Sequence, residues 1–310
     1  MTTAILTKEE SKTFIRIKNL IDTKKIDIST IARGVNKSAS TISLYLSKKY
    51  TGRIDMLEAD LDNYLKLFEE SQKIEAKVME TVDTSILKRV FNAANMCQMR
   101  GKMGVCYGSP GIGKTTAILE YQKQNAGVIY VDPFEKTSAR AVLEQIASQL
   151  RVNYYPTITM DAFCAGVIKK LEKNKCIIIV DEAENLRVDI FKILRKIHDR
   201  TRENCGMLFV GTEELSILLQ KVKYGFPYIS SRIGYIERLD RLKIDDVEKL
   251  VKQYFPNTKS AIINLMAKTG NYNARNIQNL MDLCLDIMQS NNIEELDADV
   301  IETAREKLLI

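Results

Sequence analysis

A glycine-rich stretch, GSPGIGKT, constrains the fold of this chain more than any other feature of its sequence. It follows the apolar run MGVCYG and opens the helical stretch TTAILEYQKQ. The spacing G-x-x-x-x-G-K-[ST] lets the backbone turn so that its N–H groups form a nest for an anion at a helix N-terminus. A strand, this turn and a helix, in that order, predict a phosphate-binding loop. The residues expected to form it are Gly108, Ser109, Pro110, Gly111, Ile112, Gly113, Lys114, Thr115 and Thr116.

A second acidic motif completes the phosphate chemistry. The apolar run CIIIV ends at Asp181 and Glu182, which follow Lys114 by 67 and 68 positions. Lys114 can reach the outer phosphates of a nucleotide, and Thr115 and Asp181 can hold Mg²⁺. Glu182 is predicted to orient or deprotonate the attacking water. An acidic pair after a strand also serves as a helix cap, but the loop upstream requires such a partner. The two motifs predict a protein that binds and hydrolyses ATP with Mg²⁺.

The strand and helix pattern predicts an α/β fold. Four short runs, MGVCYG, GVIYVD, CIIIVDE and GMLFVGT, alternate with helical stretches, as in a parallel sheet covered by helices. The strands are expected to stop at about Ile236, and four amphipathic helices follow as a C-terminal bundle. The expected domains are an all-α helix-turn-helix domain at 1–68, a linker at 69–84, an ATPase core at 85–236 and a helical lid at 237–310.

Three polar residues further along the chain are candidates for the same site. Thr212 ends the run GMLFVGT and would sense the outermost phosphate, unless it is an ordinary strand-to-turn threonine. Arg232 would stabilise transition-state charge on a nucleotide held by a neighbouring subunit, unless it is a surface arginine in an ion pair. Arg275 begins a predicted helix and would reach back to the nucleotide of its own subunit, unless its role is structural.

The run TIARGVNKSASTISLYLSKKYTG, ahead of the ATPase motifs, has the pattern of a helix-turn-helix. Asn36 occupies the turn position where glycine is usual, and asparagine tolerates a positive φ. The positions spaced to form a small core between the two helices are Ile31, Val35, Ile42 and Tyr45.

The basic charge of the chain is concentrated in this run. Residues 23–53 hold seven basic side chains and one acidic one, and their surplus equals the +6 of the whole chain. This concentration predicts binding to double-stranded DNA. The alternative is a helical module for protein contacts whose basic face is merely solvated. The residues expected to contact DNA are Lys37, Ser38, Ser40, Thr41, Ser43, Lys48 and Lys49.

The composition argues against a disulfide framework, a metal site built on cysteine or histidine, and a membrane span. Six cysteines are scattered without any C-x-x-C pair, which is typical of buried free thiols in a reducing compartment. The single histidine, His198, is expected to lie on a solvated or half-buried helix face. Apolar runs such as CIIIV are too short to span a membrane, so we expect a cytoplasmic protein.

The order of these motifs resembles that of the AAA+ ATPases over about residues 80–310. Nearly the whole chain resembles the B-type transposition ATPases of Mu-like phages. The stretches that carry this resemblance are, in order, TIS and KYTG in the N-terminal run, EY after the phosphate loop, VDEA, and SRI around Arg232. The resemblance implies a largely sequence-independent DNA-binding ATPase in a bacterial host cell, which forms helical filaments on DNA and delivers target DNA to a DDE transposase that stimulates hydrolysis. Thr212, where the family has asparagine, and Asn36 are departures. DNA contacts inside such a filament would fall on Lys123, Lys136, Thr137 and Arg140.

Two other functions are compatible with the same motifs. One is an ATP-dependent transcriptional regulator that reads an operator through the helix-turn-helix. The other is a replication initiator or helicase loader, which would require a helicase partner. The chain shows no nuclease, helicase or transferase motif that would decide between them.

Overall fold

The structure, a computed structural model, describes residues 11–22, 26–75, 81–135, 137–225 and 231–308. The chain divides into two compact units, Met1–Glu80 and Thr81–Ile310. One hydrophobic core lies in the first unit and two lie in the second. Within the described ranges, no helix combines the length and the apolar character that crossing a bilayer requires.

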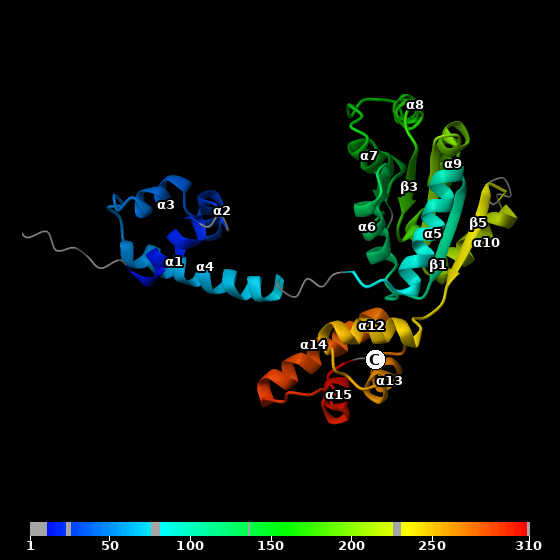
Figure 1. The fold of residues 1–310 in the computed structure, drawn as a ribbon. Helices are drawn as coiled ribbons and strands as arrows, with labels where there is room; N and C mark the ends of the chain where they lie inside the picture. The colour runs from blue at the N-terminus through cyan, green and yellow to red at the C-terminus, as the bar shows by residue number, and fades with distance from the viewer. Residues whose placement is uncertain (1–10, 23–25, 76–80, 136, 226–230, 309–310) are drawn as a thin grey trace, which may run out of the picture. The chain divides into compact units, whose positions relative to one another are not determined.

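The first unit consists of helices only in its described part (Figure 1). Asp27 and Ser38 cap the second and third helices, each by accepting a backbone N–H three residues further on. Asn36, in the turn between these helices, has a φ of +50°. The fourth helix continues to Glu75, beyond the boundary expected at residue 68. The helices are α1 (Lys12–Asp22), α2 (Ile28–Gly34), α3 (Ala39–Leu46) and α4 (Ile54–Glu75).

The second unit is built on a five-stranded sheet in the order β2-β3-β4-β1-β5, and every strand pair is parallel. The four strands predicted from the apolar runs are confirmed. Their bounds are β1 (Met103–Gly108), β2 (Val128–Val131), β3 (Cys176–Val180) and β4 (Cys205–Gly211). The three central strands β3, β4 and β1 are almost fully buried, which explains their continuous apolar sequences.

The four apolar runs leave out a fifth strand, which ends at Leu239, three residues beyond the point where strands were expected to stop. This strand, β5 (Ile233–Leu239), pairs with β1 along its length and contains the boundary expected between 236 and 237. Its side chains alternate between half-buried and exposed, and Ile236 is 63% exposed. This edge strand therefore lacks the continuous apolar run by which the other four were recognised.

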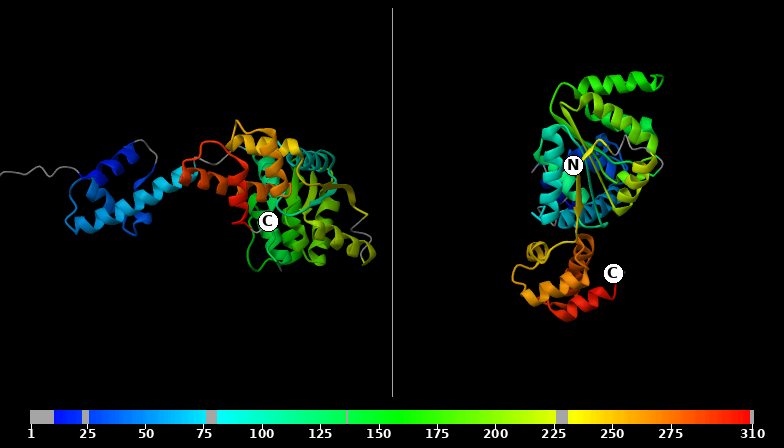
Figure 2. Two further views of the ribbon diagram at one scale, coloured as in Figure 1. Left: turned by 90° about the horizontal axis from the view of Figure 1, so that it is seen from below. Right: turned by 90° about the vertical axis from the view of Figure 1, so that its right-hand side faces the viewer.

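Helices cover both faces of the sheet, as Figure 2 shows in its right-hand view. One face packs against α5 (Ser85–Arg100) and α6 (Lys114–Gln124), and this core continues into the C-terminal helices. The other face packs against α7 (Ala139–Gln149), α8 (Met160–Leu171) and α9 (Val188–Thr201). A short turn of helix, η1 (Ala183–Asn185), follows β3, and α10 (Glu213–Gly225) follows β4.

The C-terminal bundle has the four helices that its amphipathic sequence predicts: α12 (Ile244–Tyr254), α13 (Ser260–Thr269), α14 (Ala274–Asn291) and α15 (Ala298–Arg305). Asp246 of α12 fastens the bundle to the start of α5, because it accepts hydrogen bonds from the Ser85 amide at 2.6 Å and hydroxyl at 2.5 Å. The Thr84 side chain caps α5 by accepting the Leu87 backbone N–H.

Candidate nucleotide site

The phosphate-binding loop joins β1 to α6 at the carboxyl edge of the sheet. Gly111 and Gly113 have φ values of +76° and +100°, in the left-handed region that glycine occupies without strain. Lys114 is 9% exposed, and its Nζ donates to the backbone oxygens of Gly108 (2.8 Å) and Ser109 (2.9 Å). These two carbonyls hold the ammonium at the loop, where the oxygens of a bound phosphate would replace them as its hydrogen-bond partners.

Burial dominates the electrostatics of Lys114. Desolvation lowers the pKa of its ammonium, and the nearby carboxylates Glu184, Asp181 and Glu213 oppose that lowering. The Lys114 ammonium is thus placed to bind the phosphates of a nucleotide, because phosphate oxygens can replace both the carbonyl and the carboxylate oxygens around it.

Thr115 and Asp181 come together as the sequence predicts. The Thr115 hydroxyl donates to Asp181 Oδ2 at 2.6 Å, and Asp181 is 2% exposed. Burial raises the pKa of Asp181, while the hydrogen bond from Thr115 opposes the rise. The two oxygens lie close to the separation of about 3 Å that neighbouring ligands of an octahedral Mg²⁺ have. This oxygen pair fits a Mg²⁺ ion.

Glu182 occupies the turn after β3 with a φ of +44°. Its side chain is exposed, and its Oε2 accepts a hydrogen bond from Asn185 Nδ2 at 3.1 Å. The same amide nitrogen lies 3.4 Å from the Pro133 carbonyl, in the segment after β2. The water-activating role of Glu182 stays a prediction.

Thr212 lies one residue beyond β4, and β4 pairs with β1 up to Tyr107 opposite Gly211. It therefore lies beside the start of the phosphate loop. Its hydroxyl accepts the Glu214 amide at 3.3 Å, and its own amide donates to Glu184 Oε1 at 3.0 Å. Sequence reasoning missed Glu184, because only the tertiary fold brings η1 against the end of β4.

The lid contacts the loop at two points. The Arg275 amide, in the first turn of α14, donates to the Gly111 carbonyl at 2.9 Å, and the Arg275 side chain is exposed. Asn273 caps α14 through Oδ1, and its Nδ2 donates to the Pro110 carbonyl at 2.7 Å. Sequence reasoning also missed Asn273, although an asparagine ahead of a predicted helix is a signal for a cap.

Arg232 is placed at the other end of the sheet. It immediately precedes β5, whose Ile233 lies opposite Met103 and whose Leu239 lies opposite Gly108. At the rise of a parallel strand, the five steps from Met103 to Gly108 separate Arg232 from the loop by about 17 Å. Its Nε donates to Asp199 Oδ1 at 2.8 Å, and Asp199 also pairs with Arg195. Arg232 is therefore not part of the site formed by its own subunit.

The candidate DNA residues of the first unit lie at and around α3. Ser38, Ser40 and Ser43 are exposed, Thr41 is half-buried, and the Ser38 hydroxyl bonds to the hydroxyls of Ser40 and Thr41. Lys37, Lys48 and Lys49 are exposed, with Lys37 3.6 Å from Asp60 and Lys48 over the ring of Phe14.

The candidate DNA residues of the second unit differ from one another in their exposure and in their bonding partners. Lys123 has a 72% exposed side chain and pairs with Glu120 at 3.4 Å, whereas the Thr137 hydroxyl donates to the Phe134 carbonyl. Arg140 already has bonding partners within the unit, since it pairs with Glu144 and donates to two backbone carbonyls of the segment between α7 and α8. Lys136 lies outside the described residues.

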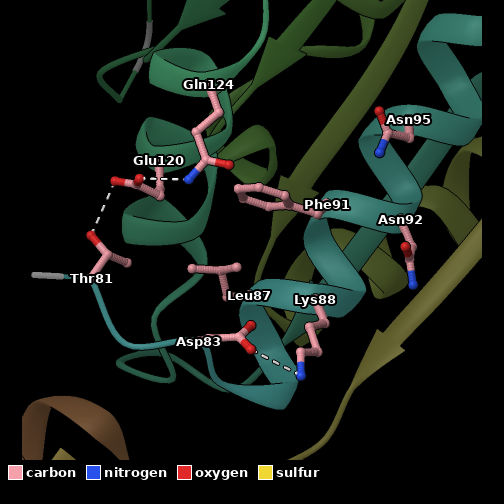
Figure 3. A pocket seen from close by; sticks show the side chains of 9 residues that line it. All are labelled: Thr81, Asp83, Leu87, Lys88, Phe91, Asn92, Asn95, Glu120 and Gln124. Carbon is pink, nitrogen blue, oxygen red and sulfur yellow. Dashed lines mark hydrogen bonds and ion pairs between the residues drawn. The ribbon is translucent and has the colours of Figure 1, made fainter.

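A pocket of about 530 Å³ lies apart from the phosphate loop, along α5 and the outer side of α6 (Figure 3). Its polar rim is largely paired within itself: Glu120 accepts from Thr81 and Gln124, and Lys88 pairs with Asp83. The pocket shares no residue with the phosphate loop and is not the candidate site.

Comparison with known proteins gives a consistent result. An AAA domain model matches residues 97–219. The chain is 23% identical to the Mu-like prophage FluMu DNA transposition protein B of Haemophilus influenzae, over 81% of this chain and 88% of that protein. It is 24% identical to the ATP-dependent target DNA activator B of Escherichia phage Mu, over 76% of this chain and 75% of that protein.

Solved structures agree on the fold. The Aeropyrum pernix ORC2 protein superposes with a TM-score of 0.58 at 17% identity, covering 74% of this chain and 69% of that one. The ORC1 protein of the same organism, solved in complex with DNA, gives 0.55 at 17% identity, with 74% and 66% covered. The domain match and the geometry of the loop therefore show a chain with an AAA domain and support ATPase activity, and most of its length is similar to the transposition B proteins of Mu-like phages.

Proposed function

We propose that this protein is an ATP-dependent activator of target DNA in transposition, which assembles on double-stranded DNA as a filament and delivers that DNA to a DDE transposase. The names of the phage relatives support the target-DNA role and its dependence on ATP.

Within one subunit, ATP and Mg²⁺ would bind to residues of the phosphate loop and of the end of β3. The loop amides and Lys114 would hold the phosphates, and Thr115 with Asp181 would hold the ion, which neutralises charge as it develops on the transferred phosphoryl group. Glu182 would orient the attacking water once its carboxylate leaves Asn185. Thr212 and Arg275 would complete the site from β4 and the lid.

The position of Arg232 is the observation that carries the proposal of assembly. An arginine at the amino end of β5 cannot reach the phosphates at the carboxyl end of β1, but it can face those of an adjacent subunit in a head-to-tail array. Such an array continues into a filament when the rotation between subunits does not close a ring. ATP at each interface would then hold neighbouring subunits together, and hydrolysis would release them.

The contact with DNA is assigned to both units. The exposed hydroxyls and lysines around α3 fit phosphate and groove contacts, and Lys123, Lys136 and Thr137 are candidates in the filament interior. We expect Arg140 to contribute less to DNA binding, because its guanidinium already donates to two backbone carbonyls of the segment between α7 and α8.

Mixing two inactive variants tests the shared site. Glu182→Gln should disable hydrolysis in its own site but keep its Arg232, and Arg232→Ala should do the reverse. Each alone is expected to lose roughly 100-fold or more of the DNA-stimulated ATPase rate. A mixture should regain activity, because some interfaces pair an intact site with an intact arginine.

Arg305→Ala is the matched control, since Arg305 is also an exposed arginine paired with a carboxylate but lies in α15. It should keep the full rate. If the mixed variants regain nothing, or if Arg232→Ala hydrolyses normally on DNA, the shared site is contradicted. Electron microscopy with DNA and a slowly hydrolysed ATP analogue should show filaments of wild type.

Competition binding separates this function from that of an operator-reading regulator. A target-DNA activator should be displaced about equally by any duplex of the same length. A regulator would prefer one short sequence by about 1,000-fold or more at matched salt.

A further inference from the structure

Glu184 stands out among the carboxylates near the phosphate loop. It lies on η1, three residues after Asp181, and its Oε1 accepts the Thr212 amide at 3.0 Å. Its Oε2 is buried without a hydrogen-bond partner among the described residues. A buried carboxylate oxygen without a donor is destabilising, so some other interaction must favour its presence there.

The sequence makes room for this oxygen. A Cβ at Gly211 would lie 2.1 Å from Glu184 Oε2, so only glycine at this position lets the carboxylate reach the end of β4. Gly211 pairs with Tyr107, the residue before Gly108, and the Gly108 carbonyl accepts the Lys114 ammonium. The carboxylate therefore lies beside the start of the phosphate loop.

The charge of Glu184 acts on Lys114. Burial is the largest influence on the pKa of Lys114 and lowers it, and Glu184 counteracts this more strongly than Asp181 or Glu213 does. Without nucleotide, the fixed negative charge of Glu184 is thus balanced by Lys114. When an outer phosphate binds, Lys114 turns to the phosphate and the carboxylate faces added negative charge across a short distance.

We propose that Glu184 is a positioning residue that sets the preference of the site between ATP and ADP: it holds Thr212 at the end of β4, and its charge opposes the γ-phosphate. The inference rests on the ATP site proposed above. ADP lacks the γ-phosphate, which Thr212 at the end of β4 is expected to contact, so the carboxylate would weaken ATP binding more than ADP binding. In an ATP-dependent assembly, such a penalty would shorten the life of the ATP-bound state.

Glu184→Gln in the full-length protein tests the role of the charge. Glutamine keeps an oxygen that accepts the Thr212 amide but removes the negative charge. The measurement is the Kd of a slowly hydrolysed ATP analogue and of ADP, both with Mg²⁺. The ratio of the ATP-analogue Kd to the ADP Kd should fall by roughly three- to tenfold, as Coulomb's law predicts for one charge at an effective dielectric constant of about 20 with partial screening.

Two further variants separate charge from structure. Glu184→Asp keeps the charge but is too short for the Thr212 contact, and it should leave the ratio close to that of wild type while the ATPase rate falls. Glu214→Gln removes an exposed carboxylate at the start of α10 and should change neither quantity. A purely structural role would instead shift both Kd values together and leave their ratio unchanged.

If Glu184→Gln does not fold, Gly211→Ala provides the second route, because its Cβ displaces the carboxylate from the end of β4 and should lower the ratio in the same direction. A ratio that stays constant or rises in the folded variant overturns the inference. A wild-type protein that binds neither nucleotide contradicts the ATP site itself, which is a distinguishable result.

Discussion

His198 is buried, although its neighbours in the sequence are charged. Its neighbours on α9 are charged, and the sequence analysis expected a solvated or half-buried ring, yet the ring is 5% exposed. Its Nε2 lies 3.1 Å from the Gly101 carbonyl, and its Nδ1 is buried with no partner among the described residues. The prediction was wrong because Gly101, nearly a hundred positions earlier, closes over this face of the helix.

The burial of His198 predicts a pH dependence of stability. Desolvation lowers the pKa of the imidazole below its ordinary value of about 6.5. As the pH falls below that value, the unfolded chain takes up a proton that the folded protein does not, so stability present above pH 6.5 is lost by at most about 1.4 kcal/mol per pH unit. Thermal unfolding at pH 7.5 and 5.5 should show a larger drop in Tm for wild type than for His198→Gln.

Glutamine is a suitable comparison, because its amide nitrogen can still donate to the Gly101 carbonyl but does not titrate. Equal drops in Tm for the two proteins would show that other groups, such as carboxylates, account for the pH dependence.

At the scale of elements, the cap of α14 links the lid to the phosphate loop. Asn273 performs two tasks, since Oδ1 caps the helix and Nδ2 holds the Pro110 carbonyl. A Cβ at Gly111 would lie 2.6 Å from Asn273 Oδ1 and would displace this side chain, and the φ of +76° also favours glycine. The lid is thereby fastened to the backbone that binds the phosphates.

Two substitutions at Asn273 separate the cap from the contact with the loop. Asn273→Ser keeps a capping oxygen but is too short to reach Pro110, and Asn273→Ala loses both. Urea unfolding should show a loss of about 1 kcal/mol for the alanine variant and a much smaller loss for the serine variant. Both should weaken ATP binding by roughly fivefold, the effect of one hydrogen bond. Unchanged ATP affinity in the serine variant would mean that the loop does not depend on the lid.

At the scale of the whole molecule, the two units have separate cores and separate predicted tasks. Residues 81–310 contain the complete nucleotide site, and the basic residues around α3 lie in the first unit. We expect residues 81–310 alone to fold and to bind ATP with the affinity of the full chain.

DNA binding should respond differently to the same truncation. Loss of the basic run should weaken the affinity for duplex DNA and reduce the slope of log affinity against log salt, because fewer phosphates are neutralised. Binding isotherms at several salt concentrations measure both quantities. An unchanged slope would place the DNA contacts in the second unit alone.

The sequence by itself determined the phosphate loop, the acidic pair, four of the five strands and the four lid helices. Each of these depends on local backbone chemistry or on burial that leaves a continuous periodic trace. Only the tertiary structure revealed β5, because an edge strand is half exposed and carries no continuous apolar run. Glu184, Asn273 and His198 likewise acquire their roles from partners at 28, 163 and 97 positions' separation. The same holds for Arg232: its place at the amino end of the sheet follows from the parallel pairing of β5 with β1, and that pairing is set by packing between distant segments rather than by local sequence.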